Sequence, residues 1–585
     1  MFGAKQVVDY LRQCFLPFLG WIGELRDGKV VKADIIAGIT VALVLVPQSM
    51  AYAQLAGLPA YYGLYASFLP PMVAAIFGSS RQLATGPVAM VSLMTATALE
   101  PLATQGGDGF LAYALGLALM VGVFQIALGM LRLGVLVDLL SHPVVVGFTN
   151  AGALIIATSQ LNKVFGVEKV AGEHHYQTVI NIINSAIDHT HLPTLWMAAL
   201  AILIMIGLKR FYPKIPNVLV AVVTTTLLAW YTGFSESGGK VVGAIPEGLP
   251  GISMPGFDLE ILAQLATYAI IIALVGFMEA IAIAKAMAAK TRQRLDANQE
   301  LIGQGLSNIT AGLFSGYPVS GSFSRSAVNI NAGAVTGFSS VVTGLMVGLA
   351  LLFLTPLLYH LPLATLAAVI ILAVANLVKV GPIIHAWKAE PQDAVVAVIT
   401  FALTLYIAPH IEYGILVGVI LSIMLFIMRS MRPRVAELSR YKDGTMRDIT
   451  VFPELQTSDK IALLRFDGSL YFANAGYFED KVLELVSKYP NLRYIIIDGE
   501  AINQMDSSGE EVLHHLADRL KSLHIEFVVA RMKRQFMKTI RRTGLLDSIG
   551  EDHFHSRIQF ALNYAWDGLG EDYDRTKCPL RRQID

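Results

Sequence analysis

The sequence predicts a polytopic α-helical membrane protein that ends in a smaller α/β domain. Hydrophobic residues make up 54% of the 585 residues and charged residues only 15%, whereas a soluble domain carries about 25% charge. The charges are also unevenly spread, since residues 341–378 contain none. Apolar runs of about 20 residues cross a hydrocarbon core of about 30 Å as helices. After Arg429 short apolar strands alternate with helical segments, which is typical of an α/β domain.

Fourteen segments are candidates for membrane spans, and the basic residues orient them. The spans lie at about 34–52, 61–77, 86–100, 110–131, 143–162, 192–210, 216–233, 262–284, 297–312, 321–331, 336–358, 362–379, 391–408 and 412–429. With both termini inside, the inner side holds Lys5, Arg12, Arg26, Lys29, Lys32, Arg81, Arg132, Lys209, Arg210, Lys214, Lys285, Lys290, Arg292, Arg294, Lys379 and Lys388. The outer connections hold only Lys163, Lys169 and Lys240. The positive-inside rule therefore predicts a multi-pass protein of a bacterial inner (plasma) membrane with both termini cytoplasmic.

The same changes in composition give the expected domain boundaries. We predict a cytosolic N-terminal segment (1–33), a transmembrane domain (34–430), a linker (431–449), an α/β domain (450–567) and a loose C-terminal tail (568–585). In the α/β domain, strands are expected at 461–466, 494–497 and 525–530, and helices at about 475–488 and 507–522.

An internal repeat divides the transmembrane domain. Pro47–Ala53 aligns with Met278–Ala284, and Gly86–Val88 aligns with Tyr317–Val319, both at an offset of 231 residues. The matches predict two halves of seven spans, at about 34–233 and 262–429. Because seven is odd, the second half would enter the membrane from the opposite side, which makes an inverted repeat.

Two of the predicted spans are too short to cross the membrane. Val88–Glu100 would make a helix of about 20 Å, and Ser322–Asn331 is shorter still. Both follow backbone interrupted by Gly and Pro, so we expect half-helices that begin near the middle of the membrane. Their unpaired N–H groups and partial positive charges would bind an anion between them. The alternative is an ordinary pair of kinked helices, because Gly and Pro are common in membrane spans.

Glu279 and Arg325 are the charged candidates for this site. Glu279 is the only acidic residue between Leu262 and Arg292, and a carboxylate at membrane depth costs at least a few kcal/mol unless it is paired or protonated. It is a candidate carrier of a coupling proton, with sodium coordination and a structural pairing as alternatives. Arg325 would supply fixed positive charge to the anion or neutralise Glu279, because an unpaired buried arginine is costly.

Uncharged donors complete the candidate site. Gln48 and Tyr52 are spaced i, i+4 and so share one helix face. Their amide and phenol groups can donate hydrogen bonds to a tetrahedral oxyanion. The alternative is interhelical hydrogen bonding, and the same alternative holds for the small polar residues Ser322, Ser324 and Ser326.

Several segments resemble the SulP family of sulfate permeases and related anion exchangers. They are Asp34–Thr40, Val46–Ala53, Ala56–Pro59, Tyr62–Tyr65, Gly78–Pro87 and Gly321–Ser326. The C-terminal part, with Asp506-Ser507-Ser508-Gly509, is similar to a STAS domain. The resemblance implies fourteen helices in a uracil-permease-like inverted repeat, a core domain that moves against a gate domain, a homodimer and a cytosolic STAS domain.

The resemblance also implies roles for individual residues. The anion would lie between the third and tenth helices, bound by Gln48, Tyr52, Val88, Ala89, Phe323, Ser324 and Arg325. Glu279 falls at the position that the family ties to cation coupling. Ser508 is a candidate for phosphorylation or for contact with a cytosolic protein partner, although a simple helix cap is the alternative at this turn.

We therefore predict a secondary active transporter, not an enzyme, that carries inorganic oxyanions, sulfate first, together with protons. A G-x-x-x-x-G-K-[ST] motif is absent from the sequence, so ATP-driven pumping is unsupported. Neither a cofactor nor a metal is expected, since a solvated loop explains Glu173–His175 and Asp188–His191 better than a zinc site. The net charge of zero gives no attraction to nucleic acid. The alternatives are bicarbonate or dicarboxylate transport, with or without sodium, an uncoupled channel or exchanger, and a membrane-anchored sensor.

Overall fold

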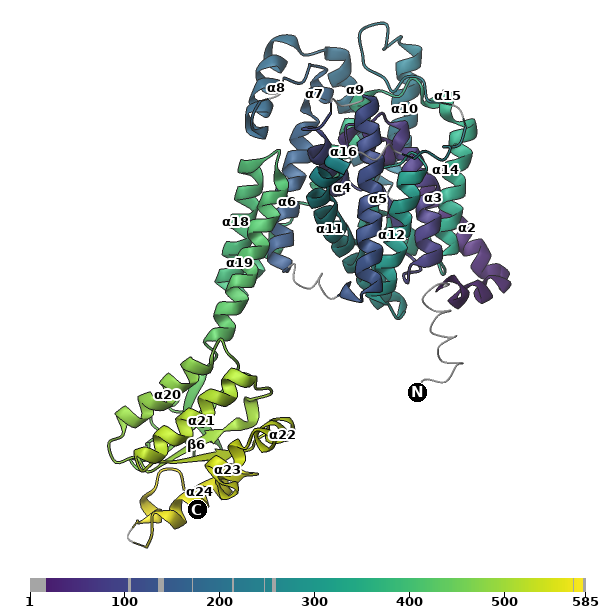
Figure 1. Cartoon of the computed structure of the whole chain (residues 1–585). Helices are drawn as coiled ribbons and strands as arrows, with labels where there is room; N and C mark the ends of the chain where they lie inside the picture. Colours follow the sequence, from purple (N-terminus) through teal and green to yellow (C-terminus); the bar gives the residue numbers. More distant parts are fainter. Residues whose placement is uncertain are drawn as a thin grey trace. The chain divides into compact units, whose positions relative to one another are not determined.

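The chain divides into two compact units, Met1–Ser422 and Ile423–Asp585 (Figure 1). The computed structural model describes residues 17–103, 107–134, 141–170, 172–212, 215–246, 248–254, 259–571 and 573–581. The first unit is helical, and the second combines helices with a six-stranded sheet.

Each of the fourteen predicted spans contains a helix. These helices are α2 (Gly28–Leu55), α3 (Tyr61–Phe77), α4 (Ala89–Leu99), α5 (Asp108–Met130), α6 (His142–Ser159), α9 (Leu192–Phe211), α10 (Asn217–Tyr231), α11 (Leu259–Thr291), α12 (Ala297–Leu313), α13 (Phe323–Asn331), α14 (Phe338–Phe353), α16 (Leu363–Ala375), α18 (Pro391–Ile407) and α19 (Ile411–Met431). Short elements between or before them are η1 (Pro17–Gly20), η2 (Ile22–Arg26), α7 (Leu161–Phe165), α8 (His175–His189), α15 (Thr355–Leu358) and α17 (Gly381–Ala389). Six helices in the described part are long and apolar enough to cross a membrane.

The helices of the first unit pack in two groups, and each group contains helices from both halves of the repeat. Helices α2–α5 pack with α11–α14, whereas α6, α9 and α10 pack with α16 and α18. The first group therefore contains the first four spans of each half. This arrangement is the one expected of a seven-plus-seven inverted repeat with core and gate domains.

Helix α12 is more polar than the helices around it, although it is buried, because it supports non-helical backbone. Asn308 Oδ1 accepts from Val319 N at 2.8 Å, and Asn308 Nδ2 donates to Val319 O at 3.1 Å. Gln304 Nε2 donates to Thr85 Oγ1 at 2.9 Å. Unpaired backbone groups inside a membrane are costly, so irregular backbone persists there only where the protein satisfies it.

The two short spans are half-helices that begin beside each other. Strands β1 (Ala84–Gly86) and β2 (Ser320–Ser322) form an antiparallel pair directly before α4 and α13. The aligned segments Pro47–Ala53 and Met278–Ala284 lie on α2 and α11, the first helix of each predicted half. At the half-helices the alignment is wrong, because Pro87 follows β1 whereas Pro318 precedes β2. The two connections differ in length, and a three-residue match could not detect that difference.

The second unit is an α/β domain built on one sheet in the order β4-β3-β5-β6-β7-β8, with β5 to β8 parallel. The strands are β3 (Val435–Arg440), β4 (Met446–Asp448), β5 (Ile461–Phe466), β6 (Tyr494–Asp498), β7 (Glu526–Ala530) and β8 (Phe554–His555). The helices are α20 (Ala475–Lys488), η4 (Gly499–Ala501), α21 (Ser507–Ser522), α22 (Arg534–Thr543), α23 (Leu545–Ile549), η5 (Glu551–His553), α24 (Ile558–Gly568) and η6 (Arg575–Lys577). The predicted strands and helices of this domain are confirmed.

Two predicted boundaries of the α/β domain are wrong. The predicted linker 431–449 contains β3 and β4, and β3 pairs with β5. The predicted loose tail packs on the sheet in its described part, where Cys578 is 5% and Leu580 1% exposed, and Arg440 Nε donates to Leu580 O at 2.7 Å. The tail is polar overall, but two apolar side chains suffice to dock it.

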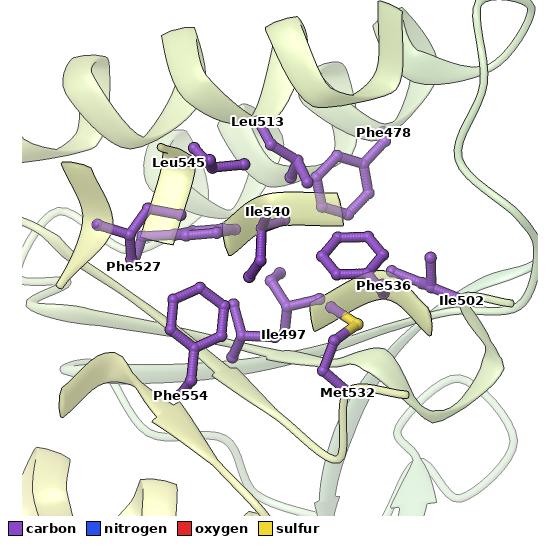
Figure 2. Close-up of a pocket in the computed structure, with 12 residues that line it drawn as sticks. Phe478, Ile497, Ile502, Leu513, Phe527, Met532, Phe536, Ile540, Leu545 and Phe554 are labelled. Atoms are coloured by element: carbon purple, nitrogen blue, oxygen red, sulfur yellow. The ribbon is translucent and has the colours of Figure 1, made fainter. Parts of the chain in front are cut away.

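The face of the sheet covered by α20–α23 carries the larger apolar core of this domain. Figure 2 shows a small cavity there, with Phe478, Phe527, Phe536 and Phe554 among its side chains. The cavity holds about 10 Å³, close to the space of a single water, and such apolar voids stay dry. We therefore interpret it as a packing defect of the core.

Candidate functional site

The first unit contains a cavity of about 1270 Å³ that is lined by both helix groups. The first group contributes residues of α2, α4, α11 and α13, and the second contributes residues of α6, α9, α10 and α16. Six of the seven predicted anion-site residues line this cavity: Gln48, Tyr52, Val88, Ala89, Phe323 and Ser324. Side chains from both halves of the repeat therefore meet at one place.

The N-termini of α4 and α13 open on this cavity without side-chain caps. Val88 and Ser322 are the N-cap residues, and neither makes a side-chain hydrogen bond to its helix. The first-turn N–H groups of a helix have no intrahelical partner and carry partial positive charge. Helix N-termini of this kind favour negatively charged ligands.

The strands before these helices bring the backbone close to buried groups. Gly86 ends β1 with φ of 151°, a conformation that favours glycine. A Cβ atom at this position would lie 3.4 Å from Nη2 of Arg325. Ser326 Oγ accepts from Ala84 N at 2.9 Å, so this serine has the structural role that was the alternative in the sequence. Ser322 and Ser324 bond to each other through their hydroxyls at 3.3 Å.

Arg325 is the predicted anion-site residue that does not line the cavity. It is fully buried, and in the described part of the chain its three guanidinium nitrogens have no hydrogen-bond partner. Tyr52 and Tyr317 are close enough to interact with its charge. A buried cation without a partner is strongly unfavourable, so an anion in the adjacent cavity would compensate it. Among the seven predicted anion-site residues, Arg325 alone is thus absent from the cavity lining.

Glu279 lies on α11 and lines the same cavity. Among the described residues it forms neither an ion pair nor a hydrogen bond, so the alternative of a pairing with Arg325 is wrong for this structure. The only acidic group of its membrane segment thus faces the cavity without a protein partner.

Asn150 and Lys379 are cavity residues that the sequence interpretation did not select. Asn150 Oδ1 accepts from Lys379 N at 2.8 Å, and Asn150 Nδ2 donates to Lys379 O at 3.0 Å. This clamp places the Lys379 ammonium 5.9 Å from the ring centroid of Phe323, at the start of α13. A buried asparagine in the fifth apolar span was the available signal, but its partner lies 229 residues away.

The remaining sequence candidates have structural partners. Asp506 caps α21, accepting from Gly509 N at 2.8 Å and from Phe472 N at 2.8 Å, with Ser508 half-buried in the first turn. His175 Nε2 lies 2.7 Å from Thr158 Oγ1, and His191 bonds to Thr194 Oγ1. The described residues contain no group of three potential metal ligands.

Comparison with known proteins gives the same assignment along the whole chain. The sulfate permease family profile matches residues 31–400, and the STAS domain profile matches residues 452–561. The chain is 38% identical to sulfate transporter 4.1, chloroplastic, of Arabidopsis thaliana, over 97% of this chain and 85% of that protein. It is 34% identical to the probable sulfate transporter Rv1739c of Mycobacterium tuberculosis, over 91% of this chain and 95% of that protein.

Solved structures show the same fold. The structure of SLC26A9 superposes with a TM-score of 0.89 over 97% of this chain and 95% of that one, at 22% identity. Murine Slc26a9 in the inward-facing state superposes with a TM-score of 0.87 over 96% of this chain and 95% of that one, at 24% identity. The transmembrane domain of the cyanobacterial bicarbonate transporter BicA gives 0.58 over 68% of this chain and 98% of that one, at 23% identity.

Proposed function

Because the chain belongs to the sulfate permease family, a family of membrane transporters, we propose that it is a secondary active transporter of inorganic oxyanions, with sulfate as its first substrate. The anion lies between the N-termini of α4 and α13 and is carried by alternating access. Curated relatives at 38% and 34% identity bear the name of sulfate transporters, which supports sulfate over other oxyanions.

One observation carries the proposal: two uncapped helix N-termini line the same cavity, next to a buried arginine that has no hydrogen-bond partner among the described residues. An oxyanion would accept hydrogen bonds from the first-turn amides, while Gln48 and Tyr52 add side-chain donors. It would also compensate the charge of Arg325. The site thus favours a small, multiply hydrogen-bonded anion.

The cavity extends toward the side that the basic residues place in the cytoplasm. Lys209, Lys285 and Lys379 line it, and all three stand at inner ends of spans in the proposed orientation. The fold neighbour Slc26a9 was solved in an inward-facing state. We assign the same state to this cavity, with both termini cytoplasmic and with α2–α5 and α11–α14 moving against the second helix group.

Glu279 is the proposed coupling group. A carboxylate without a protein partner at membrane depth favours uptake of a proton, and a proton taken up with an anion reduces the charge that crosses the bilayer. A sodium ion bound by the same carboxylate is the competing assignment. The STAS domain would regulate transport or stabilise a homodimer, with Ser508 at the exposed end of α21 as the candidate contact.

The test is uptake of radiolabelled sulfate by purified, reconstituted protein. We expect uptake to rise with an inward proton gradient and to be competed most strongly by unlabelled sulfate. The competitor panel contains bicarbonate, chloride and dicarboxylates, each tested with and without sodium. Stronger competition by bicarbonate or a dicarboxylate would mean that this anion, rather than sulfate, is the preferred substrate. Uptake that ignores both the proton and the sodium gradient would indicate an exchanger or an uncoupled pathway.

A further inference from the structure

Helix α8, between the fifth and sixth spans, is not explained by anion transport. It lies at the end of the helical bundle away from η1 and η2 (Figure 1), and it packs on α6, α7 and α18. Its N-terminus is held by a capping box between His174 and Gln177. The helix is therefore held in place by packing and by its cap, although its 15 residues are too short to span a membrane.

The exposed side of α8 carries a continuous apolar stripe. Tyr176, Ile180, Ile183 and Ile187 are 46%, 52%, 46% and 77% exposed. At 3.6 residues per turn these four positions fall within an arc of about 60°. Scattered exposed apolar residues need no explanation, but four at helical spacing form one surface.

The other two faces of α8 have different neighbours. The protein-facing side holds the buried residues Thr178 and Ile182. His175 anchors the same side. Its ring Nε2 lies 2.7 Å from Thr158 Oγ1 of α6, and its backbone N–H donates to Ala408 O. A third arc, about 100° from the apolar stripe, carries the polar side chains of Gln177, Asn181, Asn184 and Asp188. One face of α8 thus contacts protein, a second is apolar and exposed, and a third is polar and can be solvated.

The apolar stripe is continuous with membrane-facing surface. At one end, the ring of His174 stacks on Tyr176 at 5.4 Å and on Tyr406 of α18 at 5.9 Å. Tyr406 is 65% exposed at the end of a span. At the other end α9 begins at Leu192, which with Trp196 and Leu203 is 62% to 72% exposed. Aromatic side chains gather at the level of the lipid headgroups.

We propose that α8 is an interfacial helix that lies along the bilayer surface, with Ile180, Ile183 and Ile187 inserted at the boundary between headgroups and acyl chains. Such helices have one apolar face in the lipid and one polar face in water. The polar arc of α8 carries Asp188 and no lysine or arginine, so the contact is apolar rather than electrostatic. The bound partner is lipid, and the inference holds for any transported anion.

Contact of α8 with lipid would restrain the movement of the second helix group. Helix α6, on which α8 packs, also carries Thr149 and Asn150 of the cavity wall. The lipid contact of α8 therefore anchors the second helix group to the bilayer, while the first group holds the two half-helices.

Spin labels at two adjacent positions test the proposal in the full-length chain in liposomes. Ile183→Cys and Asn184→Cys are made in a Cys14→Ser, Cys578→Ser background, and collision with oxygen and with a water-soluble nickel chelate is measured. Both side chains are exposed, but only residue 183 belongs to the apolar stripe. We expect a several-fold higher ratio of oxygen to nickel collisions at 183 than at 184.

Two results would overturn the proposal. Equal, nickel-dominated collisions at both positions would place α8 in water. Low collision rates with both reagents at 183 would mean that protein covers the stripe, which would assign the surface to a second copy of the chain. If the serine background folds poorly, Cys578 is kept, because its thiol is buried at 5% exposure, and labelling stoichiometry verifies that it stays unlabelled.

Discussion

The two halves of the repeat line the cavity with corresponding helices, α2 and α4 from the first half and α11 and α13 from the second, but with different side chains. In the first half, Gln48 of α2 and the start of α4, Val88-Ala89-Met90, offer only neutral groups. In the second half, the equivalent of Gln48 is Glu279, 231 residues later, and α13 begins with Phe323-Ser324-Arg325. Both charged groups of the site therefore come from the second half.

This difference separates what backbone can do from what only side chains can do. A helix N-terminus offers N–H groups and partial positive charge whatever its sequence, so both halves can bind an anion with ordinary apolar residues. A full charge or a titratable group needs a particular side chain. Under the proposed function, the first half would contribute only to binding, whereas the second half would also supply the coupling group.

The largest effect on transport is expected when Glu279 is replaced by glutamine, the residue type of its counterpart Gln48. Glu279→Gln places an amide in both halves and removes the group that can carry a proton. Accumulation of sulfate driven by a proton gradient should be lost, while exchange of internal for external sulfate should persist. Uptake under a gradient and counterflow are measured on the same vesicles, with Gln48→Glu as the mirror variant. Normal concentrative uptake by Glu279→Gln would falsify the coupling role.

Arg325→Met should have the next largest effect, because it removes the fixed charge of the second half. The charge–charge attraction that is lost is worth about 2 kcal/mol for unit charges about 8 Å apart at an effective dielectric constant of about 20, so sulfate affinity should fall about 10- to 100-fold. Arg325→Lys, which keeps the charge, should lose less. Thermal stability of the methionine variant should not fall, because the arginine has no protein partner among the described residues. Unchanged affinity would show that the backbone alone binds the anion.

Ala89→Pro tests the contribution of the first half through a single N–H group. Proline is tolerated at the first helical position, and Val88 already has the extended conformation, φ −136° and ψ 150°, that precedes proline. The variant should fold normally and bind sulfate about 10-fold more weakly, since one hydrogen bond to a charged group is lost. Ala89→Gly, which keeps the N–H group, is the matched control. Equal affinities of the two variants would show that the first N–H group of α4 does not contact the anion.

The smallest effects on sulfate affinity are expected at Asn308 and Gln304, which support the two strands and so bear mainly on stability. Asn308→Ala leaves both backbone groups of Val319 unpaired, at about 1–3 kcal/mol for each buried group. Gln304→Ala removes the donor to one side-chain oxygen, that of Thr85, and leaves the backbone hydrogen bonds of β1 intact. The midpoint of thermal unfolding in detergent should therefore fall further for Asn308→Ala. The reverse order would mean that β1, rather than β2, holds the site together.

Much of the fold could be predicted because it depends on local signals. The longer spans follow from apolar length. The starts of the short helices α4 and α13 were predicted within one residue because Gly and Pro interrupt the preceding backbone. Six anion-site residues and Glu279 were predicted to share a site, and the structure brings them to one cavity. Sequence patterns could not reveal that β3 and β4 belong to the sheet, since a short strand next to a polar turn depends on its partner strand.

Hydropathy and the backbone limits of Gly and Pro act over a few residues, so the sequence was enough to predict where the helices form and which spans are broken. The tertiary structure alone decided that Arg325 stands behind the cavity wall, that Asn150 positions Lys379, and that Leu580 closes the edge of the α/β core. Each of these depends on residues far apart in the chain that meet only after folding. Whether a side chain is buried, and which group it bonds to, depends on two segments together, so neither segment alone predicts it.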